Sequence, residues 1–179
     1  MRQTRGGWRA LGLGAVLVAG TACQDRPIAG PAVNLSGVVP VGMVQPVVIR
    51  EAGVTPGESI LTVRVHGTGV EVGAYQGEVT YDPKVVTVVA TALPEAEGEY
   101  RVLNAAEVGR IRFAAFTAAV LKEEVALRLT VRLSGAWSAA AVRATLEAVG
   151  NQEGAALAES AFRSTSAIYD ARTGATITP

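Results

Sequence analysis

Residues 70–90 read VEVGAYQGEVTYDPKVVTVVA, and this stretch decides the fold class. Within it, apolar or small residues alternate with Gln76, Glu78 and Thr80, which is the period of two typical of a strand with one buried face. A Tyr-Asp-Pro turn signal follows at residues 81–83, and the β-branched run VVTVVA comes soon after it. The stretch therefore predicts two strands joined by a tight corner, with the polar residues on the outward side of the first strand.

The corner between these strands has a structural explanation. Tyr81 ends the first strand on its buried side, and Pro83 fixes the backbone of the turn. The Asp82 carboxylate can accept hydrogen bonds from backbone N–H groups two residues further on. We therefore expect Asp82 to be structural and not catalytic.

The same period runs through most of the chain after residue 46. ESILTVRVHG at residues 58–67 and EEVALRLTVRL at residues 123–133 alternate apolar with polar side chains. Gly109 separates two further candidate strands, and WSAAAVRATLEAV at residues 137–149 is expected to be a loop followed by a strand, despite its helix propensity. In that strand, Leu146 and Ala148 are expected to alternate with Thr145 and Glu147. Eight or nine short strands without a long amphipathic helix predict an all-β sandwich.

The composition allows one domain of ordinary size. The chain has 179 residues, of which 49% are hydrophobic and 18% are charged. Three of the 16 basic residues, Arg2, Arg5 and Arg9, lie in a segment that we expect to be removed, so that 13 basic and 16 acidic residues remain, a net charge of −3. A mildly acidic body without a Lys/Arg cluster argues against nucleic acid as a partner.

The N-terminus has the features of an export signal. Its basic start precedes the apolar run LGLGAVLVAG, which is only about half a membrane span. The residues Gly-Thr-Ala-Cys end this segment and resemble a bacterial lipobox, in which Cys23 is acylated and becomes the mature N-terminus, although Gly20 stands where a branched aliphatic residue is usual. Cys23 is the only cysteine, so we favour a lipid-anchored protein of the outer membrane or cell surface over a plain secretory signal cleaved near Ala22.

These features divide the chain into four parts. We expect a signal peptide at residues 1–22, an acylated cysteine and Pro/Gly-rich tether at residues 23–46, the sandwich domain at residues 47–172 and a tail at residues 173–179. The tether is inferred from its four prolines, which break sheet ladders and favour extended chain.

Two segments resemble a known family. Residues 70–90 are similar to the signature region of cohesin domains, with a Gly-Ala-Tyr lead-in, an alternating strand, Tyr-Asp-Pro and a β-branched strand. RVLNAAEVGRIRFAAFTA at residues 101–118 resembles the cohesin segment that follows. The resemblance covers residues 47–170 and implies a nine-stranded jelly-roll sandwich that performs no chemistry. It also implies a protein partner, in the best-known cases the small calcium-binding dockerin module of polysaccharide-degrading enzymes.

The resemblance further implies which sheet face makes the contact. Cohesins use the strands that match residues 75–81 and 111–117. On the outward side of these strands and at their edge, we expect a protein-binding face that consists of Gln76, Glu78, Thr80, Asn104, Arg112 and Phe116. Cellulosomal cohesins commonly have acidic residues where this chain has Gln76 and Thr117, which argues against dockerin as the literal partner. The alternative is an ordinary solvated face, in which Glu78 and Arg112 form a cross-strand pair.

Two other non-catalytic functions remain open. A carbohydrate-binding module linked to polysaccharide breakdown needs exposed aromatic rings on which pyranose rings stack, and Trp137 and Tyr100 are the candidates for such glycan contacts. A structural envelope spacer needs no partner outside its own kind.

The sequence offers little for catalysis or for a metal. His66 is the only histidine, and the three aspartates do not form a calcium loop. Glu95, Glu97 and Glu99 are expected in a turn-like segment beside a strand. No G-x-S-x-G, phosphate-loop or H-E-x-x-H motif occurs. We therefore expect no enzyme activity, no cofactor and no metal.

Overall fold

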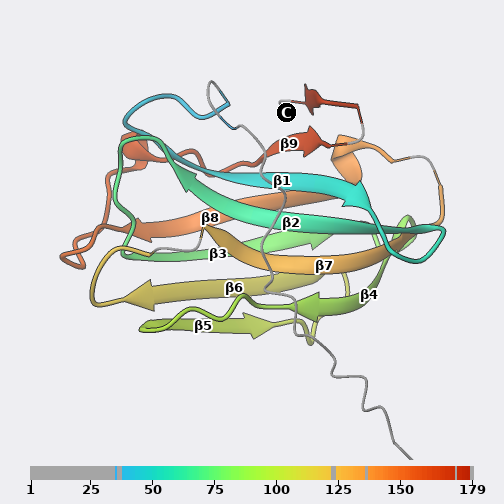
Figure 1. Cartoon of the computed structure of the whole chain (residues 1–179), viewed down its shortest axis with the longest axis horizontal. Helices are drawn as coiled ribbons and strands as arrows, with labels where there is room; N and C mark the ends of the chain where they lie inside the picture. The colour runs from blue at the N-terminus through green and yellow to red at the C-terminus, as the bar shows by residue number, and fades with distance from the viewer. Residues whose placement is uncertain (1–34, 36–37, 122–123, 136, 172, 178–179) are drawn as a thin grey trace, which may run out of the picture.

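The segments in which apolar and polar residues alternate form strands, and these strands pack as two β-sheets (Figure 1). The computed structural model describes residue 35 and residues 38–121, 124–135, 137–171 and 173–177. The strands in these ranges are β1 (Val44–Ala52), β2 (Glu58–Gly67), β3 (Ala74–Tyr81), β4 (Val86–Ala92), β5 (Glu99–Asn104), β6 (Arg110–Thr117), β7 (Val125–Leu133), β8 (Val142–Gly150), β9 (Ala167–Asp170) and β10 (Ala175–Ile177). Two short 3₁₀ turns, Ala139–Ala141 and Glu159–Ala161, lie between the later strands.

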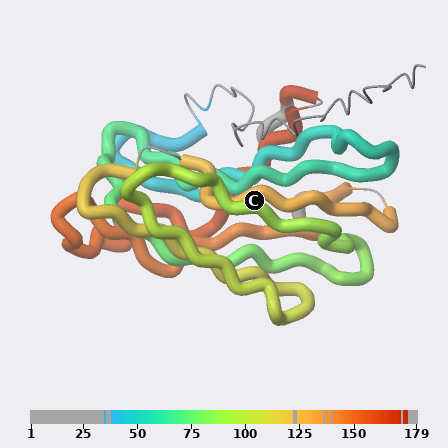
Figure 2. The backbone as a smooth tube through the Cα atoms, turned by 60° about the horizontal axis from the view of Figure 1, so that its bottom comes forward, coloured from blue at the N-terminus to red at the C-terminus, as the bar shows by residue number. Residues whose placement is uncertain are grey.

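The strands form a six-stranded and a four-stranded sheet. The larger sheet has the order β10-β9-β1-β2-β7-β4, in which β9 pairs with β1 in parallel, and the smaller sheet has the order β5-β6-β3-β8. Figure 2 shows the β5–β6 hairpin at the margin of the molecule away from β1 and β2. The prediction of an all-β jelly-roll sandwich is therefore confirmed.

The inward side chains of the two sheets form the core between them. Leu61, Val79 and Leu127 are 0% exposed, and the ring of Phe113 packs edge-on against Tyr75 with 6.0 Å between the ring centroids. Burial of a side chain of this size contributes about 1.5–3 kcal/mol to stability. The inward register expected for β2 and β3 is confirmed. In β7 it holds from Leu127 to Val131, but a β-bulge opposite Arg64 places Ala126 in the core cluster in place of Val125.

The corner after β3 has the hydrogen bonds expected of it. The backbone N–H of Lys84 donates to Asp82 Oδ1 at 2.9 Å, and the backbone N–H of Val86 donates to the Asp82 carbonyl at 2.8 Å. These bonds turn the chain from β3 in one sheet to β4 in the other sheet. Asp82 is therefore a structural residue of this corner.

Replacement of Asp82 by alanine is expected to lower the free energy of unfolding by about 1 kcal/mol, because the N–H of Lys84 loses its acceptor in an exposed turn. Asp82→Asn keeps an acceptor oxygen and is expected to remain close to the wild type. Denaturant unfolding of both variants measures the difference. Equal losses in the two variants would show that the negative charge matters and the hydrogen bond does not.

The segment 137–149 forms a loop, a 3₁₀ turn and strand β8, as predicted. One detail of its register is different. Gln76 faces Ala148 while Gly77 faces Leu146, so Glu147 is an extra residue at a β-bulge. Because of the bulge, Ala148 is exposed and does not share the inward side with Leu146, which corrects the alternation expected for this strand.

The segment before β1 is part of the fold. Leu35 and Val39 are buried and form a second small apolar cluster with Val47 and Ile49, which lie on the outer side of β1. Strand β1 itself begins at Val44. The expected boundary between tether and domain at residue 47 is therefore wrong, because β1 is apolar on both sides and its outer side chains need a cover.

The end of the chain also differs from the expectation. Part of the predicted tail forms β10, which pairs antiparallel with β9 at the edge of the larger sheet. The expected signal peptide and Cys23 lie outside the described residues. No helix in the described ranges is both long and apolar enough to cross a membrane.

Candidate binding face

The outer side of the four-stranded sheet brings the predicted contact residues together. Strand β6 pairs with β5 on one side and with β3 on the other, and Gly109 closes the β5–β6 hairpin with a φ of 85° that favours glycine. On the outward side of this hairpin, Tyr100 lies opposite Phe116 and Asn104 lies opposite Arg112. We call the outward side of β5, β6, β3 and β8 the four-stranded face.

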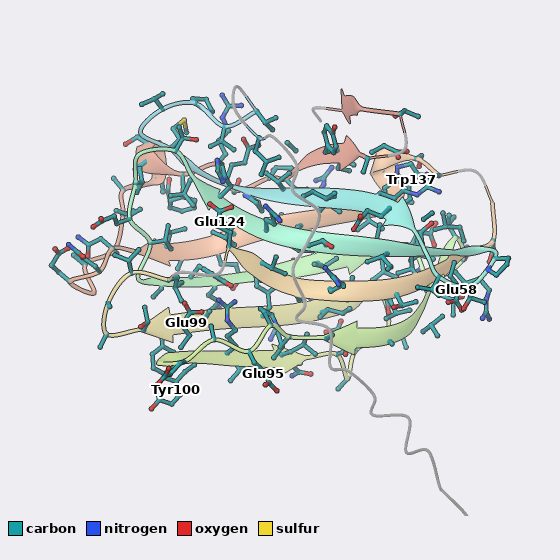
Figure 3. The ribbon with its side chains drawn as sticks, in the orientation of Figure 1. Glu58, Glu95, Glu99, Tyr100, Glu124 and Trp137 are labelled. Atoms are coloured by element: carbon teal, nitrogen blue, oxygen red, sulfur yellow. The ribbon has the colours of Figure 1, made fainter. Side chains whose placement is uncertain are left out.

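An exposed apolar ridge occupies one end of this face. Tyr100, Val102 and Phe116 are 66%, 61% and 54% exposed, and we call these three residues the aromatic ridge. The rings of Tyr100 and Phe116 are stacked, with centroids 5.0 Å apart and planes 12° apart. Figure 3 shows Tyr100 pointing away from the body of the molecule at the beginning of β5. Large apolar side chains that remain side by side in water mark contact surfaces more often than isolated ones do.

All six residues expected on the binding face lie on the four-stranded face. Gln76, Asn104, Arg112 and Phe116 are exposed, whereas Glu78 and Thr80 are half-buried. Val102 was not among the residues expected on this face, and Tyr100 was expected at a glycan site. Both residues belong to the same ridge because β5 pairs with β6 in this register.

The ion pair on this face differs from the expected one. Glu78 lies directly opposite Arg112 in the ladder, but its carboxylate accepts a hydrogen bond from Nε of Arg110 at 2.6 Å. This hydrogen bond and the charge of Glu78 raise the pKa of Arg110 above its ordinary value. The Glu78–Arg112 pair considered under the solvated-face alternative is therefore not formed, because the diagonal neighbour on β6 reaches the same carboxylate.

The other polar side chains of the face differ in their hydrogen bonds and ion pairs. The amide of Gln76 donates to Glu147 at 2.5 Å, across the bulge of β8. Among the described residues, the guanidinium of Arg112 has neither an ion pair nor a hydrogen bond. A hollow of ≈ 310 Å³ lies beside it and is lined by Asn104, Ala106, Glu107, Arg110 and Arg112.

Trp137 does not form an open platform for a sugar. It is half-buried and packs against the core, and the guanidinium of Arg50 lies over its ring at 5.0 Å from the centroid. The ring face is therefore covered by a cation of the protein itself. Of the two expected glycan contacts, Trp137 thus has one ring face covered by Arg50, whereas Tyr100 is exposed.

His66 lies away from this face, near the end of β2. Its Nδ1 is 3.0 Å from Glu124 Oε1, and Arg64 lies 3.9 Å from the same carboxylate. Within the part of the chain that the structure describes, no group of three His, Cys, Asp or Glu side chains is placed to hold a metal ion.

Strand β5 carries a buried charged pair that was not expected from the sequence. Glu99 and Arg101 point inward from β5, form an ion pair at 2.5 Å, and have side chains only 2% and 5% exposed. The guanidinium also donates to the Tyr75 hydroxyl at 2.8 Å and to the Val125 carbonyl at 2.9 Å. Side-chain alternation on either side of Tyr100 places Glu99 and Arg101 on the same side of β5, and this alternation could have indicated the pair. Glu99 was expected at the surface in a turn-like segment because charged side chains are seldom buried.

The two packed sheets form a β-sandwich of the jelly-roll class. A comparison with solved structures shows that this fold is similar to that of a cohesin module. A chain of the type I cohesin–dockerin complex Coh-OlpA–Doc918 from Clostridium thermocellum is 11% identical, with 72% of this chain and 99% of that chain covered and a TM-score of 0.50.

Two further solved structures give similar values. The second type II cohesin module of the adaptor ScaA scaffoldin from Acetivibrio cellulolyticus is 12% identical, with coverage of 76% and 98% and a TM-score of 0.49. A non-cellulosomal cohesin from the archaeon Archaeoglobus fulgidus is 10% identical, with coverage of 70% and 91% and a TM-score of 0.48. No protein-family model and no curated protein sequence matches the chain. At these identities the likeness concerns the fold.

Proposed function

We propose that this protein is a non-catalytic binding or scaffolding module of the cell envelope that recognises a protein partner through the four-stranded face. The observation that carries the proposal is the aromatic ridge, in which Tyr100 and Phe116 are stacked and more than half exposed. Aromatic residues that become desolvated in a complex dominate the binding energy of many protein interfaces.

The surroundings of the ridge suit such a contact. Gln76, Glu78, Thr80 and Asn104 add polar groups beside this apolar ridge, and protein interfaces usually combine the two. Strands β3 and β6 are paired on both sides, and the edge strand β5 is paired with β6, so the backbone of the face is ordered before binding. A preformed face loses little conformational entropy when a partner docks.

The fold also bears on the kind of partner. The Coh-OlpA–Doc918 structure is a cohesin–dockerin complex, so a protein module of the dockerin kind is a natural candidate for this chain as well. The contact positions nevertheless depart from the family. The Thr117 hydroxyl, at a position that is often acidic in cohesins, donates to the Gly98 carbonyl at 3.1 Å and accepts from the Ala119 N–H at 3.3 Å, so it serves the loop ends around it.

Export and anchoring are part of the proposal. The lipobox-like sequence that ends at Cys23 supports an acylated N-terminus and a location at the outer membrane or cell surface. The mass of the mature N-terminal peptide tests this, because acyl chains on Cys23 add the mass of the lipid.

Phe116→Asp is expected to weaken partner binding by at least about tenfold, because a charge would enter the centre of the apolar contact. The test passes the envelope and secreted proteins of the source organism over the immobilised mature protein and identifies the bound material by mass spectrometry. The affinity of a recovered partner is then measured for the wild type and the variant. Thermal unfolding verifies that the variant is folded.

Val54→Asp is the matched control, since Val54 is 97% exposed in the β1–β2 hairpin of the other sheet and receives the same change. Binding that survives Phe116→Asp, or that is lost equally in Val54→Asp, would contradict the assignment of the face.

Glycan binding is the second candidate, and the exposure of Tyr100 favours it. The stacking of Tyr100 on Phe116 covers one face of each ring, so at most one face of Tyr100 is available to a pyranose ring. The glycan hypothesis expects retention of the protein on insoluble polysaccharide that is lost in Tyr100→Ala. Retention without any protein partner would replace the proposal above.

A further inference from the structure

The charged side chains of the four-stranded face differ in whether they have ion-pair or hydrogen-bond partners. Its strand side chains include three arginines and two glutamates, namely Arg110, Arg112, Arg143, Glu78 and Glu147. Arg110 is paired with Glu78 at 2.6 Å, and Glu147 accepts from Gln76 at 2.5 Å. In the described ranges, the guanidinium groups of Arg112 and Arg143 make no ion pair and no hydrogen bond. With Arg110 and Glu78 paired, Arg112, Arg143 and Glu147 leave a net charge of +1 on the strands of this face, because the neutral amide of Gln76 does not cancel the charge of Glu147.

Arg112 differs from Arg143 in its setting. It lines the hollow of ≈ 310 Å³ together with Asn104, its cross-strand neighbour on β5. Oδ1 of Asn104 accepts a hydrogen bond from the Ala106 N–H at 3.0 Å. Since only the oxygen of an amide can accept this bond, the NH₂ group of Asn104 is left as a donor. Glu107 also lines the hollow; its carboxylate lies 3.8 Å from Arg110, shares that cation with Glu78 and makes no ion pair with Arg112.

The hollow therefore presents hydrogen-bond donors and a positive charge to an incoming group. A carboxylate is the protein group that matches a planar guanidinium and an amide donor together. A carboxylate would also compensate the charge of Arg112, which has no ion pair within the described part of the protein.

The ladder sets the distance between this hollow and the aromatic ridge. Along β5 the outward residues are Tyr100, Val102 and Asn104, each two positions from the next. At about 3.3 Å per residue, Asn104 lies about 7 Å from Val102 and about 13 Å from Tyr100. A partner that uses both features needs its acidic and apolar side chains at this separation.

We infer that the partner binds with a carboxylate side chain on Arg112 and Asn104 and an apolar side chain on the aromatic ridge, about 7–13 Å apart. This inference rests on the proposed function of the four-stranded face. In an extended segment the acidic and apolar residues are then about two to four positions apart, and in a helix about five to nine. The partner thus contributes the negative charge, and this chain contributes the positive one.

The test is a selection of phage-displayed random peptides on the mature wild-type protein, followed by affinity measurements with the selected peptides. We expect the selected peptides to share an acidic residue and an apolar residue at the stated spacing. Arg112→Glu is expected to weaken their binding by at least about tenfold. Arg143→Glu is the matched control, because it reverses an exposed, unpaired arginine on the same face, and it is expected to change the affinity by less than about twofold. A peptide in which the acidic residue is changed to lysine is expected to regain binding to the Arg112→Glu variant.

The outcomes separate the inference from the proposed function. Peptides that need Phe116 but contain no acidic residue, and that bind Arg112→Glu unchanged, would overturn the inference and leave the function of the face intact. Peptides that are indifferent to Phe116→Asp, or no selected peptides at all, would overturn both. Equal losses in Arg112→Glu and Arg143→Glu would show a general charge effect and also overturn the inference.

Discussion

Replacement of Arg101 by methionine is expected to lower the free energy of unfolding by about 3–5 kcal/mol. The substitution removes the guanidinium that faces the carboxylate of Glu99, a side chain that is only 2% exposed. It also removes the hydrogen bonds to the Tyr75 hydroxyl and to the Val125 carbonyl, and with them a polar link from β5 to β3 and to β7 in the opposite sheet. A buried carboxylate that loses its cation is costly because its negative charge stays in a poorly hydrated site. Denaturant unfolding with constant m-value measures the loss.

Two comparisons show whether burial is the cause. Arg132→Ala breaks an ion pair with Glu58 at 3.0 Å in which the arginine side chain is 61% exposed, and it is expected to cost less than about 1 kcal/mol. The double variant Glu99→Leu, Arg101→Met replaces both charges with apolar groups and is expected to recover most of the stability. A loss in Arg101→Met no larger than that in Arg132→Ala would contradict the assigned role.

Gly77→Ala is expected to destabilise the domain by about 3 kcal/mol, since the new Cβ has no space. It would lie 2.3 Å from the carbonyl oxygen of Thr145 and 2.9 Å from Cζ of Phe113. Gly77 is in β3, the central strand between β6 and β8, so the backbone of β8 would have to move. The β-bulge at Glu147 adjoins this position, and we expect the contact between Gln76 and Glu147 to change as well. Thermal and denaturant unfolding measure the first effect.

Gly135→Ala is the control for this substitution, because a Cβ at Gly135 meets no heavy atom within 4 Å. It is expected to leave the stability within about 0.5 kcal/mol of the wild type. A Gly77→Ala variant that is equally stable would mean that β3 and β8 separate easily and that the four-stranded face is less rigid than the structure indicates.

The residues of β3 show how well alternation along a strand predicts which side chains are buried. Tyr75 and Val79 are buried and Gln76 is exposed, as alternation predicts, because successive side chains of a strand point to opposite sides whatever its neighbours are. The same reasoning placed Phe116 outward on β6. It failed for Ala148, since a bulge is determined by the partner strand and has no clear signal in the sequence.

The pairing of charges could not be predicted in the same way. Glu78 was expected to pair with Arg112 because the two are opposite each other, but Arg110 reaches the carboxylate from the diagonal position. The inward position of Arg101 was not expected either, because burial of an arginine becomes acceptable only once Glu99, Tyr75 and Val125 are placed around it. Such partners come from different strands.

By itself, the sequence determined the all-β class, the corner at Asp82 and the outward direction of Gln76, Glu78, Thr80, Arg112 and Phe116. These properties depend on neighbouring residues in the chain, through side-chain alternation and turn chemistry. The tertiary structure alone decided that Tyr100 stacks on Phe116, that Arg50 covers Trp137 and that Leu35 and Val39 cover the outer side of β1. These contacts join residues of different strands or segments, so they are set by strand order and register, which only the packing of the whole domain specifies.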